Sequence, residues 1–151
     1  MWCSLTAMLL PLKCVYCQNH HISDGKSGIR ITDSRLSEIF IELQKKGANN
    51  INLVTPTHYT LSVINAVLKA RENGLVIPVI YNCSGYEKTQ TLDMLRGIVD
   101  IYLTDFKYIR RETAMRYSCA PDYPEAVKRA LDCMFDQTGS PEFDEKGIMK
   151  K

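Results

Sequence analysis

The 151-residue sequence predicts an α/β fold in which parallel strands alternate with helices. Three short runs at 51–54, 77–81 and 99–103 are apolar and rich in β-branched or aromatic side chains, which is typical of strands buried on both faces. They recur about every 25 residues, with helical patterns between them. Strand, helix and strand at this pitch indicate right-handed crossovers, as in a barrel or a doubly wound sheet.

The predicted helices have recognisable ends. The first starts at Asp33, a residue type that caps helices, and ends at Gly47. The last has Pro124 in its first turn and stops near Gly139. Two further helical patterns lie at 59–73 and, more weakly, at 88–96.

Composition limits the class of protein. With 45% apolar and 24% charged residues, the chain has the profile of one globular domain with a sizeable core. A net charge of +2, with basic residues scattered among acids, does not favour nucleic acid as a partner. The apolar run at 5–12 is too short to span a membrane and lacks the flanks of a signal peptide. Six cysteines in a core-rich chain of this size indicate reduced thiols, so we expect a cytoplasmic protein.

Polar residues follow each of the three predicted strands, at 55–58, 82–86 and 104–107. Because the carboxyl ends of parallel strands meet at one edge, chemistry gathers there. Asp105 and Lys107 lie two residues apart, on the same side of a strand. They are read either as site residues or as a solvated ion pair. A further reading is an aldolase-like barrel in which Lys107 forms a Schiff base and Asp105 tunes its pKa.

Cys14 and Cys17 form a C-x-x-C pair that His20 and His21 follow closely. Thiolates and imidazoles at such spacings bind zinc. A redox dithiol and a pair of inert thiols are the other readings of the isolated motif. A haem attachment would need a histidine directly after Cys17, where the sequence has Gln18.

Four linked motifs in order carry a resemblance to a known family. They are Lys-Cys-Val-Tyr-Cys-Gln-Asn at 13–19, the stretch 52–59, Tyr-Asn-Cys-Ser-Gly-Tyr at 81–86, and the stretch 100–108. Over about residues 12–149 the chain resembles the radical S-adenosylmethionine (radical SAM) proteins related to pyruvate formate-lyase activating enzyme. The resemblance implies a partial (β/α) barrel of about four parallel βα units. A closed barrel takes about 250 residues, so we expect a truncated one in residues 12–151, with 1–11 as an altered or non-homologous amino terminus.

The resemblance also implies a [4Fe–4S] cluster and S-adenosylmethionine as cofactors. In the family motif C-x-x-x-C-x-aromatic-C, three thiolates hold three irons, and the fourth iron binds the methionine moiety. Cys14 and Cys17 match the second and third ligands, as catalytic and metal-binding residues, whereas Leu10 stands where the first cysteine is expected. We do not expect Cys3, eleven positions before Cys14, to replace it.

Further positions match the family's contacts with S-adenosylmethionine. A lysine suits a carboxylate and an acid or amide suits an ammonium group. The implied cofactor-binding residues are Tyr16 near the adenine, Thr55 and Pro56 near the methionine amino group, Asn82 and Ser84 after the strand at 77–81, and Asp105 with Lys107 near the methionine carboxylate.

The implied activity is that of a radical SAM oxidoreductase of the activating-enzyme type. It cleaves S-adenosylmethionine reductively, and the 5′-deoxyadenosyl radical then abstracts hydrogen from a substrate. The implied partners are a glycyl radical enzyme or a small molecule as substrate, and flavodoxin or ferredoxin as electron donor. The alternative is a small zinc- or iron-binding α/β module without radical chemistry, using Cys14, Cys17 and His20 or His21.

Overall fold

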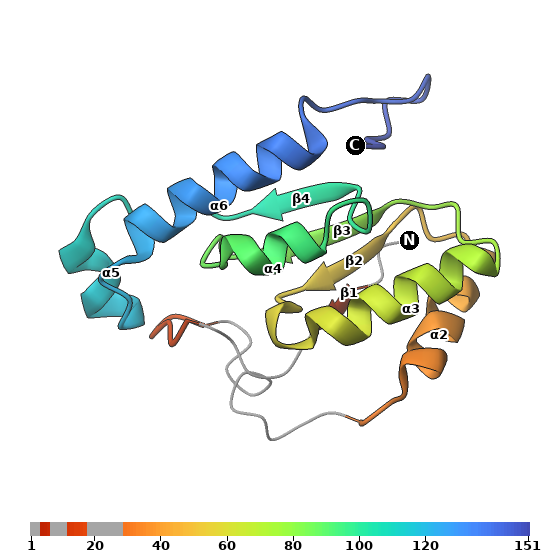
Figure 1. Cartoon of the computed structure of the whole chain (residues 1–151), viewed down its shortest axis with the longest axis horizontal. Coiled ribbons are helices and arrows are strands. Elements are labelled where there is room, and N and C mark those ends of the chain that lie inside the picture. Colours follow the sequence, from red (N-terminus) through yellow and green to blue (C-terminus); the bar gives the residue numbers. More distant parts are fainter. Residues whose placement is uncertain (1–3, 7–11, 18–28) are drawn as a thin grey trace.

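A computed structural model of the chain describes residues 4–6, 12–17 and 29–151 and contains the predicted parallel sheet (Figure 1). Its strand order is β1-β2-β3-β4, and all three pairings are parallel. The strands are β1 Ser4–Thr6, β2 Ile51–Val54, β3 Val79–Cys83 and β4 Ile101–Thr104. The helices are α2 Asp33–Lys45, α3 Thr60–Glu72, α4 Thr89–Met94, α5 Arg111–Ser118 and α6 Tyr123–Thr138, with a 3₁₀ turn η1 at Thr57–Tyr59.

The strands follow one another in chain order, so every crossover runs in the same direction across the sheet. Leu53 pairs with Tyr81 and Tyr81 pairs with Tyr102, which places these side chains on the face that packs against the helices. The other face carries Asn82 and Leu103, and Leu103 is 49% exposed. This is the strand order of a barrel wall, whereas a doubly wound sheet reverses its order at a switch point. In the described part of the chain the sheet is open.

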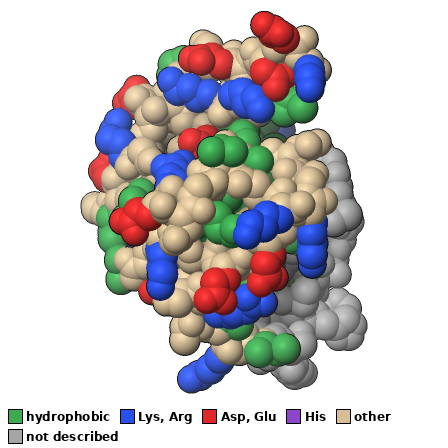
Figure 2. Space-filling model, turned by 90° about the vertical axis from the view of Figure 1, so that its right-hand side faces the viewer, with side chains coloured by type: hydrophobic (Ala, Val, Ile, Leu, Met, Phe, Trp, Pro, Cys, Tyr) green, Lys and Arg blue, Asp and Glu red, His purple; other side chains and the backbone are tan. Residues whose placement is uncertain are grey.

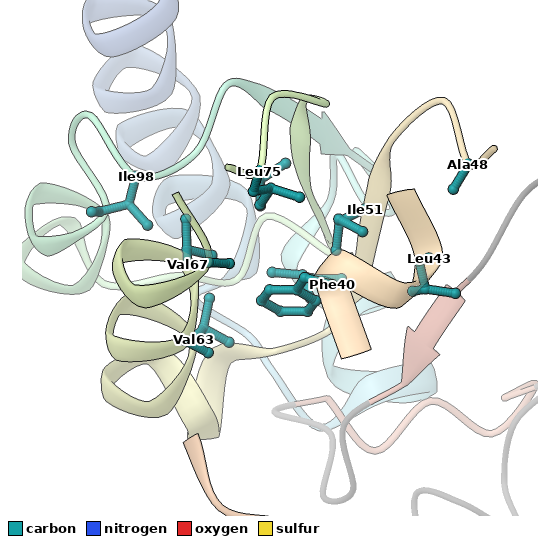
Figure 3. Packing of buried hydrophobic residues seen from close by; sticks show 12 residues of the cluster. Phe40, Leu43, Ala48, Ile51, Val63, Val67, Leu75 and Ile98 are labelled. Carbon is teal, nitrogen blue, oxygen red and sulfur yellow. The ribbon is translucent and has the colours of Figure 1, made fainter. Parts of the chain in front are cut away.

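The largest core cluster lies where α2 and α3 cover β2 and the start of β3. Figure 3 shows Phe40 of α2 at its centre, facing Ile51 of β2 and the α3 residues Val63 and Val67. Phe40, Ile51 and Val67 have no exposed surface. Burying side chains of this size contributes about 2 kcal/mol each, so this cluster anchors β2 against the helix layer.

The predicted strand boundaries agree with the structure to within about two residues. The run at 51–54 matches β2, whereas the runs at 77–81 and 99–103 each begin two residues too early. Pro78 has no N–H for the sheet, and its carbonyl oxygen accepts from the Ile51 N–H at 2.9 Å, just before β3 starts. The predicted cap Asp33 is wrong by one residue, because the Thr32 hydroxyl accepts the Arg35 N–H at 3.1 Å and Asp33 is the first helical residue.

Two elements lie where no strand or helix was predicted. β1 falls within 1–11 and pairs with β2, so this segment takes part in the sheet even though its homology to the family stays an untested prediction. Helix α5 is short and polar, and it ends at Cys119 in the left-handed conformation, with φ +54°. Glycine is the usual stop signal at that position, so the sequence carries no mark of where α5 ends.

Figure 2 shows the face of the molecule at the amino ends of the strands, where basic and acidic side chains are intermixed. On this face the charged side chains are not gathered into a patch of one sign. None of the helices in the described ranges combines the length and apolar character that crossing a membrane requires.

Gly85 is the glycine whose replacement should disturb the fold most. Its φ is +73°, and an added Cβ would lie 2.5 Å from Val127 Cγ2 and 3.0 Å from Thr104 Cγ2. We expect Gly85→Ala to lower the free energy of unfolding by roughly 2–4 kcal/mol, because overpacking adds to the cost of a left-handed alanine. Denaturant unfolding measures it.

Gly97→Ala is the matched control for this prediction. Gly97 has nearly the same φ, +74°, and nothing lies within 4 Å of the added Cβ. Its substitution should lower the free energy of unfolding by about 1–2 kcal/mol. Equal losses in the two variants would show that the contact with Val127 does not matter.

Candidate functional site

The C-x-x-C turn lies at the carboxyl edge of the sheet, beside α5 (Figure 1). The turn is closed by a bond from the Cys17 N–H to the Cys14 carbonyl oxygen at 3.1 Å. It is tied to α5 by the Val15 N–H, which donates to the Tyr117 carbonyl oxygen at 3.0 Å. Both cysteines are half-buried, and Cys14 packs against one of the core clusters.

A row of hydroxyl groups leads to the Cys14 sulfur. The Ser118 hydroxyl donates to Cys14 Sγ at 2.9 Å, and it also lies 2.6 Å from the Tyr108 hydroxyl. The Tyr16 and Tyr108 hydroxyls are hydrogen-bonded to each other. Partial burial and this bond raise the pKa of Tyr16, so its hydroxyl keeps its proton. Tyr16, which the resemblance implied to lie near an adenine, makes an edge-to-face contact with the Tyr108 ring and is 52% exposed.

Tyr123 joins the ends of β3 and β4 beneath the C-x-x-C turn. Its hydroxyl lies 2.7 Å from the Ser84 carbonyl oxygen and 2.9 Å from the Asp105 carbonyl oxygen, and it accepts from the Lys107 N–H at 2.8 Å. The ring is fully buried in the cluster against which Cys14 packs. Three predicted site residues and a predicted metal ligand therefore surround one tyrosine.

The end of β2 is strained. Thr55 has φ +50°, which β-branched residues rarely adopt, and its N–H donates to the Asn82 carbonyl oxygen at 2.7 Å. The next residue, Pro56, is buried and precedes η1. Strain of this kind persists where surrounding contacts enforce it, and it is frequent at binding sites. The structure therefore brings Thr55 and Asn82 together at the edge where sequence reasoning expected them.

Two buried polar atoms near this edge have no hydrogen-bond partner in the described part of the chain. They are Ser84 Oγ, directly after β3, and Asn52 Oδ1, which lies earlier along β2 on the same sheet face as Asn82. An unsatisfied buried polar group costs about 1–3 kcal/mol, and a polar ligand offers it a partner.

Asp105 and Lys107 pair with each other. The distance from Lys107 Nζ to Asp105 Oδ2 is 2.7 Å, and the Asp105 side chain is 64% exposed. The structure thus contains the ion pair that the sequence allowed as one reading. A ligand carboxylate at Lys107 would share or replace this partner.

The described residues do not by themselves make up a metal site. Across residues 4–6, 12–17 and 29–151, no three histidine, cysteine or acidic side chains gather as a metal-binding group. Two thiolates on one turn suit zinc or an iron–sulfur cluster in their chemistry, but each needs at least a third ligand. The residues named as candidates for it, Leu10's position, Cys3, His20 and His21, lie outside the described residues.

A separate groove of about 600 Å³ lies on the helix side of the same edge. At its base, the Thr57 hydroxyl donates to Glu87 Oε1 at 2.7 Å, and the Tyr81 hydroxyl lies 3.5 Å from Glu87 Oε2. Glu87 is 6% exposed, and burial raises the pKa of its carboxyl to about 7. The groove is lined by Thr57, His58, Tyr86, Glu87, Lys88, Thr89, Gln90, Thr91, Asp122, Ala126 and Arg129.

Cys83, in the third motif, belongs to the core and not to the site. It is 2% exposed, and burial raises the pKa of its thiol to about 12. A buried neutral thiol is a poor nucleophile and a poor metal ligand. The half-buried sulfurs of the C-x-x-C turn therefore differ from it in access.

Sequence reasoning missed the residues that support the predicted ones. Ser118, Tyr108 and Tyr123 reach the site from the fourth strand's end and from the helices after it. Tyr108 closes the fourth motif, and an aromatic residue with a hydroxyl there was a usable signal. Glu87 directly follows the third motif, and no pattern distinguishes it from a surface acid.

Comparison with known proteins finds a relative of this chain. The chain is 32% identical over 126 residues to an uncharacterized protein of Methanocaldococcus jannaschii. The match covers 78% of this chain but only 36% of the archaeal protein, so the chain spans about a third of that relative's length. No protein-family model matches the chain.

Glu87 should make stability depend on pH. Below pH 4.5 the carboxyl is protonated in both states, whereas between pH 4.5 and about 7 only the folded state keeps the proton. The free energy of unfolding therefore falls as the pH rises through this window, by roughly 3 kcal/mol. Glu87→Gln should remove this component, so its stability relative to the wild type should rise from pH 4.5 to 8. Urea unfolding at several pH values measures it.

Glu72→Gln is the control for this test. Glu72 is exposed at the end of α3, and its substitution should leave the pH profile of the wild type intact. The idea fails if Glu87→Gln follows the wild-type profile as well.

Proposed function

We propose that this chain is an iron–sulfur protein of the radical SAM type, related to the activating enzymes of glycyl radical enzymes. The observation that carries the proposal is the position of the C-x-x-C turn at the carboxyl edge of a parallel sheet in sequential strand order. The polar residues that follow three consecutive strands lie at this same edge. In barrel-like folds this edge is where ligands and catalytic residues gather.

Cys14 and Cys17 would hold the cluster. The cluster would supply an electron for reductive cleavage of S-adenosylmethionine to a 5′-deoxyadenosyl radical, with flavodoxin or ferredoxin as electron donor. The substrate that loses hydrogen would be a glycyl radical enzyme or a small molecule.

The remaining site residues would bind and orient S-adenosylmethionine. The Lys107 ammonium group is held by Asp105 at 2.7 Å and would attract the methionine carboxylate. Thr55 and Pro56 would meet the amino group at the end of β2, with Asn82 of β3 and Ser84 directly after it beside them. The unpaired Ser84 Oγ has hydrogen-bonding capacity free for that purpose. Tyr16 would pack near the adenine.

The metal is tested first. Anaerobic reconstitution with iron and sulfide should give a broad absorption band near roughly 400 nm, and iron and sulfide should be found bound to the chain. The Cys14→Ser, Cys17→Ser double variant should lose the band because it lacks both thiolates. Cys119→Ser, which removes an exposed thiol on the neighbouring helix end, is the matched control and should keep it.

The outcome also decides between the two readings of the motif. Stoichiometric zinc bound through Cys14 and Cys17, with no iron–sulfur band after reconstitution, would favour the small metal-binding module without radical chemistry. Loss of the band in Cys119→Ser but not in the double variant would place the cluster elsewhere.

Binding of S-adenosylmethionine is tested on the reconstituted protein. Lys107→Ala and Asp105→Ala should each raise its dissociation constant, roughly tenfold for Lys107→Ala, because a charge-assisted bond contributes at least 1.5 kcal/mol. Iron content should stay unchanged, since neither residue is a metal ligand. Lys150→Ala removes a lysine paired with Asp144 at 3.1 Å in the carboxyl-terminal segment and serves as control. Unchanged affinity in both site variants would exclude them from the binding site.

A further inference from the structure

The hydroxyl row at Cys14 has a defined direction. Ser118 has one hydroxyl proton and gives it to Cys14 Sγ at 2.9 Å. The bond between Tyr108 and Ser118, at 2.6 Å, must therefore be donated by Tyr108. The Tyr108 proton is then engaged, so Tyr16 donates to Tyr108, and the Tyr16 hydroxyl also lies within hydrogen-bonding reach of Cys14 itself. Every proton in the row points toward the sulfur.

Two of the three hydroxyl-bearing residues of this row, Ser118 and Tyr108, are buried in the fold. Ser118 is 3% and Tyr108 is 5% exposed, and the two lie on different elements, the end of α5 and the segment after β4. Ser118 could bond back to its own helix, as serines near helix ends often do. It instead reaches a residue 104 positions away in the chain. Water has little access to replace such a buried donor.

We propose that Ser118, supported by Tyr108 and Tyr16, is a positioning residue that fixes the Cys14 sulfur and tunes the metal centre that this sulfur would bind. The inference rests on the proposed function only in that Cys14 acts as a metal ligand. A hydroxyl that donates to a ligating sulfur withdraws charge from it, which stabilises the reduced metal centre. Successive donors polarise one another, so the tyrosines strengthen the last bond of the row.

The experiment uses the full chain under anaerobic conditions with two probes. Co²⁺ alone reports thiolate ligation through its sulfur-to-metal charge-transfer band, and iron with sulfide reports the reduction potential of the cluster. Ser118→Ala should weaken Co²⁺ binding about tenfold, shift the charge-transfer band and move the potential to a more negative value. Tyr108→Phe leaves the Ser118 donor in place and should produce smaller changes of the same sign.

Three variants separate tuning from loss of structure. Ser118→Thr retains the hydroxyl and should restore both the band position and the potential. Ser37→Ala makes the same change at a buried serine of α2, and Tyr102→Phe removes a tyrosine hydroxyl that bonds to Gln137 at 2.8 Å. Neither of these two should change the Co²⁺ spectrum.

The results distinguish this inference from the proposed function. If Ser118→Ala folds and shows wild-type Co²⁺ affinity, band and potential, Ser118 is structural and the inference is wrong. If Co²⁺ binding responds to Ser118 as expected but no iron–sulfur cluster assembles, the inference stands and the radical SAM function fails. If the wild-type chain binds neither Co²⁺ nor iron through Cys14, both are overturned.

Discussion

The candidate site depends on the buried hydroxyl of Tyr123, a single group that holds two strand ends in place. Parallel strands lose their ladder partners where they end, and the backbone groups of Ser84 and Lys107 lie at that point. From α6, the Tyr123 hydroxyl donates to the Ser84 carbonyl oxygen and accepts from the Lys107 N–H. Its ring packs edge-to-face against the Tyr108 ring, at a centroid distance of 5.3 Å. Because Tyr108 in turn contacts Ser118, the position of the Cys14 sulfur is set by packing that starts at α6. Burial of the ring keeps water from competing for these bonds.

The sequence predicted the parts of the fold that periodicity encodes. Buried strands and amphipathic helices leave regular patterns, and Pro124 and Gly139 marked the ends of α6 where the structure has them. Helix α5 escaped because it is short, polar and closed by Cys119 rather than glycine. β1 escaped because three residues are too few to form a pattern, and its place is set by pairing with β2, a contact about 48 residues away in the chain.

The positions of the candidate site residues along the chain were predictable from the sequence, but their mutual contacts were not. Strand ends can be located from the strands, so Thr55, Asn82 and Asp105 were found at one edge. What could not be read was which groups pair with which, because tertiary contacts decide this. Asp105 neutralises Lys107, Glu87 lies buried under Thr57, and Ser118 reaches Cys14 through a helix that no pattern marks. The spacing of residues along the chain indicates which side chains are candidate site residues. It does not indicate which other side chains contact them and change their chemistry.

The bond between Ser118 and Cys14 also has a consequence for the order in which the molecule matures. A chain is synthesised from its amino end, so the C-x-x-C turn leaves the ribosome some hundred residues before its partner helix does. Closing so long a loop is slow compared with forming local helices and neighbouring strands. The two cysteines can therefore take their final positions only after β2, β3 and β4 have assembled and α5 has docked. The hydrogen bond between Ser118 and Cys14 is therefore one of the last contacts of the fold to form, and the surroundings of the C-x-x-C turn are complete only when folding is.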